Sequence, residues 1–328
     1  MAASEQQERV NTDARIVAAL PSLAAWLREE GYRFITVTPA THARVLARDS
    51  GPARDLRDVF GWSRPFHPAL LPAAALEALR SADLLETRGD GQLRSLVRFS
   101  SLRTQLFAHD AYPTSAADAV FFGPDTYRFV QQIEHDVAAA PLPPQGRILD
   151  LGCGSGAGGI AAALAAAASA PRLVLTDINA RALSFAAGNA AHARCAEPQL
   201  AQGDLYAPTQ GRFDLVVANP PYLNDAAQRA YRHGGGRFGE ALSIRIVREG
   251  LPRLAPGGRL LLYTGVAMAD GEDPLLQALQ GELDRQGWPW HYEELDPDVF
   301  GEELEQPAYA DAERIAAVAL RVQRPADR

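Results

Sequence analysis

The sequence predicts an α/β fold, in which a mostly parallel, seven-stranded sheet carries helices on both faces and a smaller helical domain precedes it. Three observations predict this fold. Short apolar runs alternate with helical stretches from Arg147 onward, which is the pattern of successive strand-helix units. A glycine-rich turn at 152–156 directly follows the first run, as expected where a strand reverses into a helix. The last two apolar runs have no helical stretch between them, which predicts a closing hairpin.

The N-terminal region is predicted to be mainly helical. Apolar residues at helical spacing predict a helix over 13–30, which Pro21 should kink or divide. A helix over 72–82 leads into Leu-Leu-Glu-Thr at 84–87, a Gly-Asp-Gly turn, and alternating apolar residues from 93 to 99. A helix followed by such a hairpin resembles a winged helix with its wing.

The sheet region begins after a predicted helix over 126–138 and a proline-rich loop. Its predicted strands cover 147–151, 173–176, 199–201, 213–218, 258–264, 288–293 and 315–322. The helices between them are predicted over 157–170, 180–193, 242–254 and 274–286. The 328 residues are too many for one ordinary domain. We therefore predict a helical, winged-helix-like domain over 1–108, for substrate recognition, site closure or dimerisation, and an α/β domain over 109–328.

Composition limits the classes of function. The net charge of −8 disfavours binding to a phosphate backbone unless basic residues gather on one face. No apolar run is long enough for a membrane span, and the N-terminus has neither the basic start nor the apolar run of a secretory signal. The two cysteines, Cys153 and Cys195, have no metal-ligand spacing. We expect a soluble, cytoplasmic protein without a metal site or a membrane partner.

The glycine turn and the acidic residues around it indicate a nucleoside ligand. The first predicted strand runs into the turn as Leu-Asp-Leu-Gly-Cys-Gly-Ser-Gly, with Asp150 inside the strand. Asp177 ends the second strand 21 residues beyond Gly156, where a carboxylate can accept both hydroxyls of a ribose. The alternatives are a tightly packed turn, a helix cap at Asp177 and an Asx turn at Asp204.

This pattern closely resembles the first motif of class I, Rossmann-like S-adenosylmethionine-dependent methyltransferases, and the resemblance covers roughly residues 120–325. It implies that S-adenosyl-L-methionine is the cofactor. The turn glycines would contact its methionine part, Asp177 its ribose, and the acid after the third strand its adenine. The cofactor-binding residues are therefore predicted to be Asp150, Gly152, Gly154, Gly156, Asp177, Ile178, Asp204, Leu205 and Asn219.

The fourth predicted strand ends in Asn219-Pro220-Pro221-Tyr222. The lone pair of an amide or aromatic NH2 group is delocalised. The nitrogen therefore attacks a methyl group only if hydrogen-bond acceptors bind its N–H groups and localise that lone pair. By resemblance, the Asn219 side-chain oxygen and the Pro220 carbonyl are those acceptors, and Tyr222 stacks on the planar group. A simple turn closing the strand explains proline here, but neither the asparagine nor the tyrosine.

This order of motifs is shared by release-factor glutamine, adenine-N6 and ribosomal guanine-N2 methyltransferases. The stretch 122–126, Phe-Gly-Pro-Asp-Thr, loosely resembles the Pro-Arg-Pro-Glu-Thr of the glutamine enzymes. A glycine triplet at 234–236 lies between Arg232 and Arg237, and we expect this loop to close over the substrate. The acidic run from Asp296 to Glu305 is expected to be a solvated surface, with selection of a basic partner as the alternative.

The sequence thus predicts an N-methyltransferase whose partner is a methyl acceptor: a protein glutamine, a nucleobase or an amide-like small molecule. A nucleobase would require a basic groove, for which the candidates are Arg94, Arg98 and Arg103 on the wing. One alternative is an enzyme that uses the cofactor for intramolecular cyclisation. The other is a non-catalytic, cofactor-sensing protein that binds nucleic acid. A homodimer is a further expectation.

Overall fold

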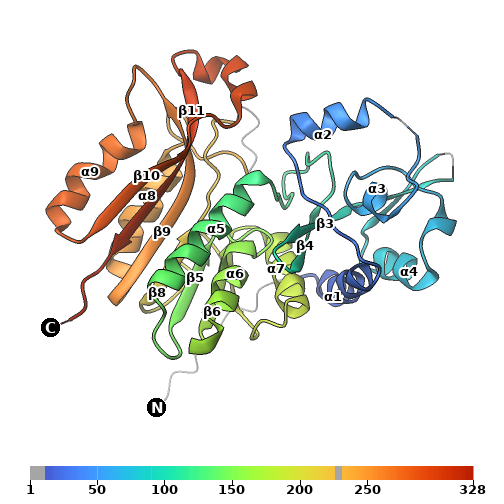
Figure 1. The fold of residues 1–328 in the computed structure, drawn as a ribbon, viewed down its shortest axis with the longest axis horizontal. Helices are drawn as coiled ribbons and strands as arrows, with labels where there is room; N and C mark the ends of the chain where they lie inside the picture. The colour runs from blue at the N-terminus through green and yellow to red at the C-terminus, as the bar shows by residue number, and fades with distance from the viewer. Residues whose placement is uncertain (1–11, 50, 90, 226–230, 328) are drawn as a thin grey trace.

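A seven-stranded sheet forms the centre of the larger domain in the computed structural model (Figure 1), which describes residues 12–49, 51–89, 91–225 and 231–327. The strands lie in the order β10-β11-β9-β8-β5-β6-β7. All neighbours from β9 to β7 pair in parallel, whereas β11 is antiparallel to both β9 and β10. The predicted mostly parallel sheet and its closing hairpin are therefore confirmed. The bounds are β5 Arg147–Leu151, β6 Arg172–Asp177, β7 Gln199–Gln202, β8 Phe213–Ala218, β9 Leu254–Met268, β10 Trp290–Asp296 and β11 Arg314–Gln323.

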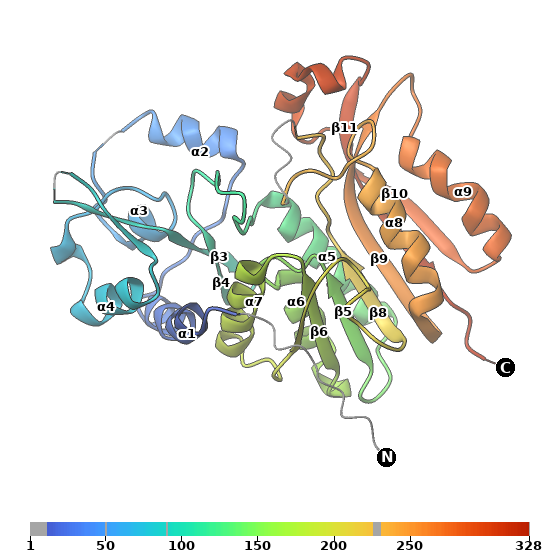
Figure 2. The ribbon, with the colours of Figure 1, turned by 180° about the vertical axis from the view of Figure 1, so that it is seen from behind.

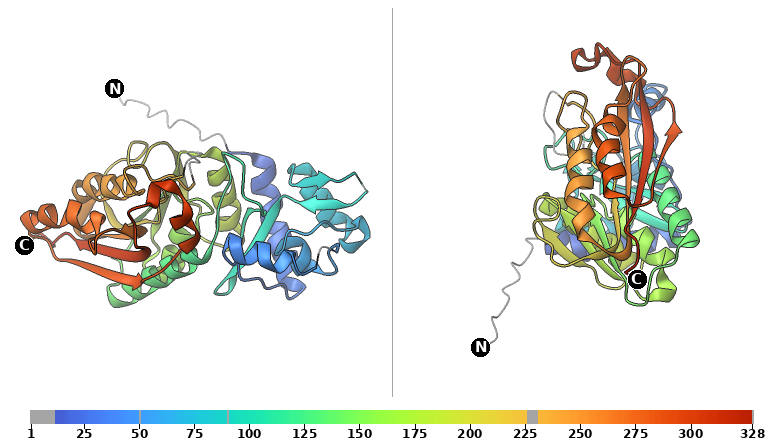
Figure 3. Two further views of the ribbon diagram at one scale, coloured as in Figure 1. Left: turned by 90° about the horizontal axis from the view of Figure 1, so that it is seen from above. Right: turned by 90° about the vertical axis from the view of Figure 1, so that its left-hand side faces the viewer.

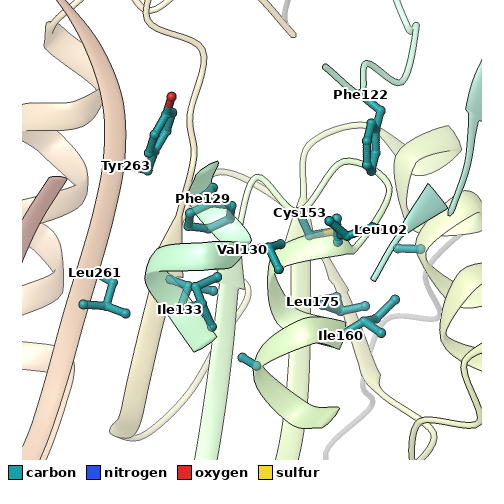
Figure 4. Close-up of a cluster of buried hydrophobic side chains, with 14 of the residues drawn as sticks. Leu102, Phe122, Phe129, Val130, Ile133, Cys153, Ile160, Leu175, Leu261 and Tyr263 are labelled. Carbon is teal, nitrogen blue, oxygen red and sulfur yellow. The ribbon is translucent and has the colours of Figure 1, made fainter. Parts of the chain in front are cut away.

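Five helices cover the two faces of this sheet. Alternate residues of each strand point to opposite faces, so Leu215 and Val217 of β8 belong to one apolar cluster and Val216 and Ala218 to another. The first cluster packs under α5 Pro124–Ala139, α6 Ala157–Ala165 and α7 Ala180–His192, and the second under α8 Ala241–Gly250 and α9 Pro274–Gln286. Figure 4 shows Phe129 and Ile133 of α5 between Tyr263 and Leu261 of β9 on one side and α6 on the other.

Several element ends differ from the sequence prediction. The predicted helix 157–170 ends at Ala165 and continues as a short 3-10 turn. The predicted helix 242–254 likewise ends at Gly250, because Pro252 follows in a 3-10 turn. Strand β9 begins at Leu254 and runs to Met268 rather than over 258–264, since it pairs with β8 along one edge and with β11 along the other.

The N-terminal domain combines helices with two small hairpins. Its elements are α1 Ala14–Glu29, α2 Pro39–Leu46, α3 Leu56–Phe60, α4 Ala73–Ser81, β1 Leu85–Thr87, β2 Leu93–Ser95, β3 Val97–Leu102 and β4 Gln105–Asp110. Strands β1 and β2 form the predicted hairpin, but the run 93–99 is split, because β3 turns away to pair with β4. Pro21 does not divide α1, whose apolar side is buried.

The two domains share an extensive contact. Helix α1 packs against α7 (Figure 2), and the domains lie at opposite ends of an elongated molecule in Figure 3. The boundary predicted between 108 and 109 falls inside β4, whose Ala108 is bonded to the larger domain. The Asn189 Oδ1 of α7 accepts the Ala108 N–H at 2.8 Å, and its Nδ2 donates to the carbonyls of Ala108 and Ser155, each at 2.9 Å. None of the described helices is long and apolar enough to cross a membrane.

Replacing Asn189 by alanine should lower the free energy of unfolding by about 3 kcal/mol, because it leaves buried backbone groups of β4 and of the glycine turn without partners. Urea unfolding measures this change. The matched control is Gln286→Ala, at the exposed end of α9. An Asn189→Ala protein as stable as that control would mean that this side chain does not join the domains.

Candidate functional site

The register of the sheet places three loops beside one another. Leu151, the last residue of β5, pairs with Thr176 of β6 and with Ala218 of β8. The residues that follow these three positions, Gly152, Asp177 and Asn219, therefore lie side by side where the three strands end. All three line a pocket of about 260 Å³, together with Asp150, Gly154, Ile178, Asp204, Leu205, Pro220 and Tyr222. The structure thus brings together every predicted site residue except Gly156.

The turn glycines have two different roles. Gly152, Gly154 and Gly156 have φ values of 62°, 52° and 79°, which disfavour residues with a side chain. A Cβ at Gly152 or Gly154 would meet no atom within 4 Å, so their backbone is open to a ligand. A Cβ at Gly156 would lie 3.0 Å from Ala186 and 3.0 Å from Ile160. Gly156 is therefore required for packing between α6 and α7, and its predicted ligand contact is not supported.

Asp177 holds the glycine turn in place. Its Oδ2 accepts the Gly154 N–H at 2.9 Å and its Oδ1 accepts the Asn179 N–H at 2.9 Å. The cap of α7 is Asn179, whose side chain accepts the Arg181 N–H, so Asp177 is not the helix cap. Burial raises the pKa of this carboxyl group. Next to it, Ile178 is 55% exposed at the pocket, as expected of an apolar side chain that a ligand covers.

Asp150 is buried beneath the turn. Its Oδ2 accepts the N–H of Gly159, in the first turn of α6, at 2.7 Å. Burial raises the pKa of Asp150 to about 7, since the charged form loses its hydration. Asp204, which also lines the pocket, is largely exposed and forms an ion pair with Arg245 at 3.0 Å. A cationic ligand would stabilise the ionised form of Asp150.

Asn219 and Tyr222 differ in how firmly they are held. The carboxamide of Asn219 forms no hydrogen bond with any residue that the structure describes, so its oxygen is available to a ligand. In contrast, the Tyr222 hydroxyl donates to Oδ2 of Asp125, while Tyr263 donates to Oδ1 of the same carboxylate at 2.8 Å. The Tyr222 ring packs over Gly265, where a Cβ would lie 2.3 Å from a ring carbon.

Asp125 and Phe300 were not predicted as site residues. Asp125 is 5% exposed and lines the pocket, and burial raises its pKa despite the two tyrosine hydroxyls. Arg128 links it to Asp296, at 3.5 Å and 2.6 Å respectively. The phenyl ring of Phe300 lies 5.9 Å from that of Tyr222. The run 296–305 is largely at the surface, as expected, but Phe300 within it lines the pocket, which was not predicted from the sequence.

Of the two arginines that flank the glycine triplet, one lines the pocket. Arg232 lines the pocket, contacts Glu303 through Nη2, and has its Nε 3.7 Å from Asp225. Arg237 is 63% exposed in its side chain and pairs with Asp311 at 2.5 Å, outside the pocket lining. Tyr231 stacks on Phe121 at 6.2 Å. Part of the loop that carries this triplet, residues 226–230, lies outside the described residues.

The basic groove considered for the wing does not form. Arg94 is bonded to the carbonyl of Tyr112 and to Glu86, and Arg103 is bonded to Glu134. Arg98 is only 4% exposed. These three arginines therefore form no row of free guanidinium groups. Arg94 and Arg103 are paired with carboxylates, and Arg98 is buried.

Known proteins resemble this chain over the α/β domain. Residues 129–270 match the family model of the methyltransferase small domain. The release factor glutamine methyltransferase of Deinococcus radiodurans is 34% identical over 200 residues, covering 58% of this chain and 66% of that protein. That of Bordetella pertussis is 35% identical over 178 residues, covering 49% and 62%. The ribosomal RNA small subunit methyltransferase C of Haemophilus influenzae is 38% identical over 93 residues, covering 27% and 26%.

A solved structure, the ribosomal protein L11 methylase of Lactobacillus delbrueckii subsp. bulgaricus, has a TM-score of 0.39 and 18% identity, covering 61% of this chain and 79% of that one. The chain spans about two thirds or less of the length of the curated relatives. The sequence matches confirm the predicted resemblance to methyltransferases of the release-factor glutamine and ribosomal RNA types.

Replacing Gly265 by alanine should displace the Tyr222 ring, since the added Cβ has no room in the centre of β9. We expect the free energy of unfolding to fall by about 1–3 kcal/mol. The control is Gly281→Ala in α9, where the nearest atom to the new Cβ is 3.8 Å away and a helical alanine is favoured. Thermal unfolding of both variants tests this, and equal stability would contradict the close packing at Tyr222.

Proposed function

We propose that this chain is an S-adenosylmethionine-dependent N-methyltransferase that acts on a planar NH2 nitrogen. One observation carries the proposal: the Asn219 carboxamide has no hydrogen-bond partner among the described residues, and it lies at the same sheet edge as the open glycine turn. The glycine turn can bind a nucleoside cofactor, and the Asn219 oxygen can accept a hydrogen bond from an amino group. A pocket that contains both is suited to transferring a small group from that cofactor to an amino nitrogen. The relatives reported above are methyltransferases in name, which supports the same reaction.

The residues of the pocket fit the cofactor. Gly152 and Gly154 would hold its amino-acid part, because their backbone can approach closely without a side chain. Asp177 has both carboxylate oxygens bonded to backbone N–H groups, and each oxygen retains a lone pair for a ribose hydroxyl. Ile178, Asp204 and Leu205 would surround the adenine. When bound, the cofactor supplies a methyl group on a positively charged sulfur, and Asp150 would offset that charge.

The acceptor nitrogen would be held by Asn219 and its neighbours. The side-chain oxygen of Asn219 and the carbonyl of Pro220 would each accept one N–H, which localises the nitrogen lone pair. Two consecutive prolines limit movement of these acceptors. Tyr222, fixed by Asp125, would cover the planar group and exclude water. No base is needed before transfer, because the product nitrogen is acidic enough to lose its proton through these hydrogen bonds to solvent water.

Charge supports a protein or small-molecule acceptor over a nucleic acid. The chain has a net charge of −8, and the wing arginines at 94 and 103 are paired with carboxylates. A phosphate backbone would therefore meet net repulsion, and these two arginines would not compensate for it. An intramolecular reaction of the cofactor would not use Asn219 as an N–H acceptor, and a non-catalytic sensor would need neither Asn219 nor Tyr222. We propose a cytoplasmic location, and homodimerisation stays a prediction.

Asn219→Ala should abolish one of the two N–H acceptors and reduce methyl transfer by about 100- to 1,000-fold, with donor affinity changed far less. The assay measures the transfer of radiolabelled methyl groups from the donor to fractions of a cell extract. The fraction that becomes labelled (protein, RNA or small molecule) identifies the acceptor class. Asn224→Ala is the control, because among the described residues that carboxamide bonds only the Arg237 carbonyl, at 2.8 Å. Undiminished labelling by Asn219→Ala would contradict the proposed role.

Donor affinity should rise with pH. The pKa of Asp150 is raised to about 7, and a cationic donor favours the ionised form, so binding at pH 6 must first remove a proton. The dissociation constant should therefore fall by about tenfold between pH 6 and pH 8. Calorimetry of wild type and Asp150→Asn measures it. In Asp150→Asn, the dissociation constant should not change between pH 6 and pH 8. If it falls equally in both proteins, a group other than Asp150 causes the pH dependence.

A further inference from the structure

Two large apolar residues have a backbone conformation that is unfavourable for them. Among the described residues, nine residues other than glycine have positive φ values, and seven of these are small or polar. The other two are Leu205 at 46° and Phe300 at 55°. A Cβ atom is crowded in this left-handed region, and a bulky residue there is an outlier. Both residues line the pocket, and such strain is typical of binding sites.

Leu205 already belongs to the proposed cofactor site, whereas Phe300 has no role so far. The simpler explanation is that the Phe300 ring only fills a gap in the core. That explanation does not account for its backbone, because the next residue is Gly301, which could adopt the left-handed conformation at little cost. Gly301 does not have a positive φ, and the nearest atom to a Cβ there is Oδ1 of Asp298, 3.7 Å away. The chain therefore has its left-handed residue at the position whose ring reaches the pocket.

Contacts on both sides of Phe300 hold its backbone in this conformation. Val299 donates its N–H to the carbonyl of Ile315 in β11, at 2.7 Å. The Phe300 carbonyl accepts the N–H of Glu303 at 2.8 Å, and the Glu303 side chain contacts Arg232 in the pocket lining. The segment between β10 and β11 is therefore bonded both to the sheet and to the opposite part of the pocket lining.

The ring of Phe300 bounds the space beside Tyr222. The two ring centres are 5.9 Å apart and the ring planes make an angle of 65°, which is an edge-to-face contact. Tyr222 cannot turn away, because its hydroxyl is bonded to Asp125 and its ring packs over Gly265. The whole pocket has a volume of about 260 Å³, whereas small-molecule sites usually have about 300–1,000 Å³. A nucleoside cofactor would leave little of this volume to an acceptor, so a ring at its border decides how large a group can enter.

We propose that Phe300 is a specificity-determining residue on the acceptor side of the pocket, where its ring limits the size of the planar group that Tyr222 can cover. This inference rests on the proposed function and adds the size of the acceptor to it. The segment between β10 and β11 then selects the acceptor, while Asn219 and Pro220 hold its nitrogen. Removing the ring enlarges this side of the pocket, so larger planar groups gain affinity relative to smaller ones.

The test compares two planar carboxamides that differ by one fused ring, 4-fluorobenzamide and 6-fluoro-2-naphthamide. Fluorine NMR measures their dissociation constants with wild type, Phe300→Ala and Trp290→Ala, each with and without S-adenosylhomocysteine. Wild type should bind the smaller compound more tightly, and this preference should fall by at least about tenfold in Phe300→Ala. Trp290 is the matched control, because it is a half-buried aromatic residue of β10 outside the pocket lining. Trp290→Ala should keep the preference of wild type.

Phe300→Gly is a second variant, because it removes the ring and the backbone strain together. Its Tm should be about 1 °C or more above that of Phe300→Ala, and its preference between the two carboxamides should fall in the same way. The Phe300→Gly comparison suffices if Phe300→Ala does not fold. An unchanged preference in these variants, or no binding of either carboxamide by wild type, would overturn the proposal.

Calorimetry with S-adenosylmethionine on the same proteins separates the two proposals. Unchanged donor binding in Phe300→Ala is expected, since the Phe300 ring contacts Tyr222 on the acceptor side. Failure of the wild type to bind the donor would contradict the proposed function, whereas the carboxamide comparison without S-adenosylhomocysteine would still test the size limit at Phe300.

Discussion

The parallel pairing of β5 with both β6 and β8 is the constraint on which the site depends. Because Leu151 pairs with Thr176 and Ala218, three loops of distant sequence leave the sheet at one edge. A shift of one residue in either pair would turn every side chain of a strand to the opposite face. The alternating apolar clusters on the two faces of β8 oppose such a shift. The core thus fixes the relative positions of Gly152, Asp177 and Asn219.

A second set of contacts completes the pocket from outside the sheet edge. Asp125, at the start of α5, accepts hydrogen bonds from Tyr222 of the strand-end motif and from Tyr263 of β9. Arg128, one turn later, joins this carboxylate to Asp296 of β10. Two parts of the chain that are far apart in sequence therefore meet at the acceptor side of the pocket. In this arrangement, a buried acid determines where the aromatic ring lies.

Local sequence predicted the sheet well, since each strand carries its own apolar run and the glycine turn is contiguous. It also predicted Asn219 and Tyr222, whose motif is read from four adjacent residues. It failed where a role depends on a distant partner. Asp125 was visible only as part of a loose motif at 122–126, because its two tyrosine partners lie 97 and 138 residues away. Phe300 was hidden in an acidic run, and Arg98 was expected on a surface because the pairing of β3 with β4 was not foreseen.

Calorimetric titration of S-adenosylmethionine into wild type and Asp177→Ala tests the central claim, that this sheet edge is a cofactor site, most directly. The account predicts one site in wild type and at least about tenfold weaker binding in Asp177→Ala, since a ribose contact and the support of the glycine turn are both lost. Asp118→Ala, at an exposed position, should bind like wild type. No binding by wild type, or equal binding by Asp177→Ala, would contradict the account.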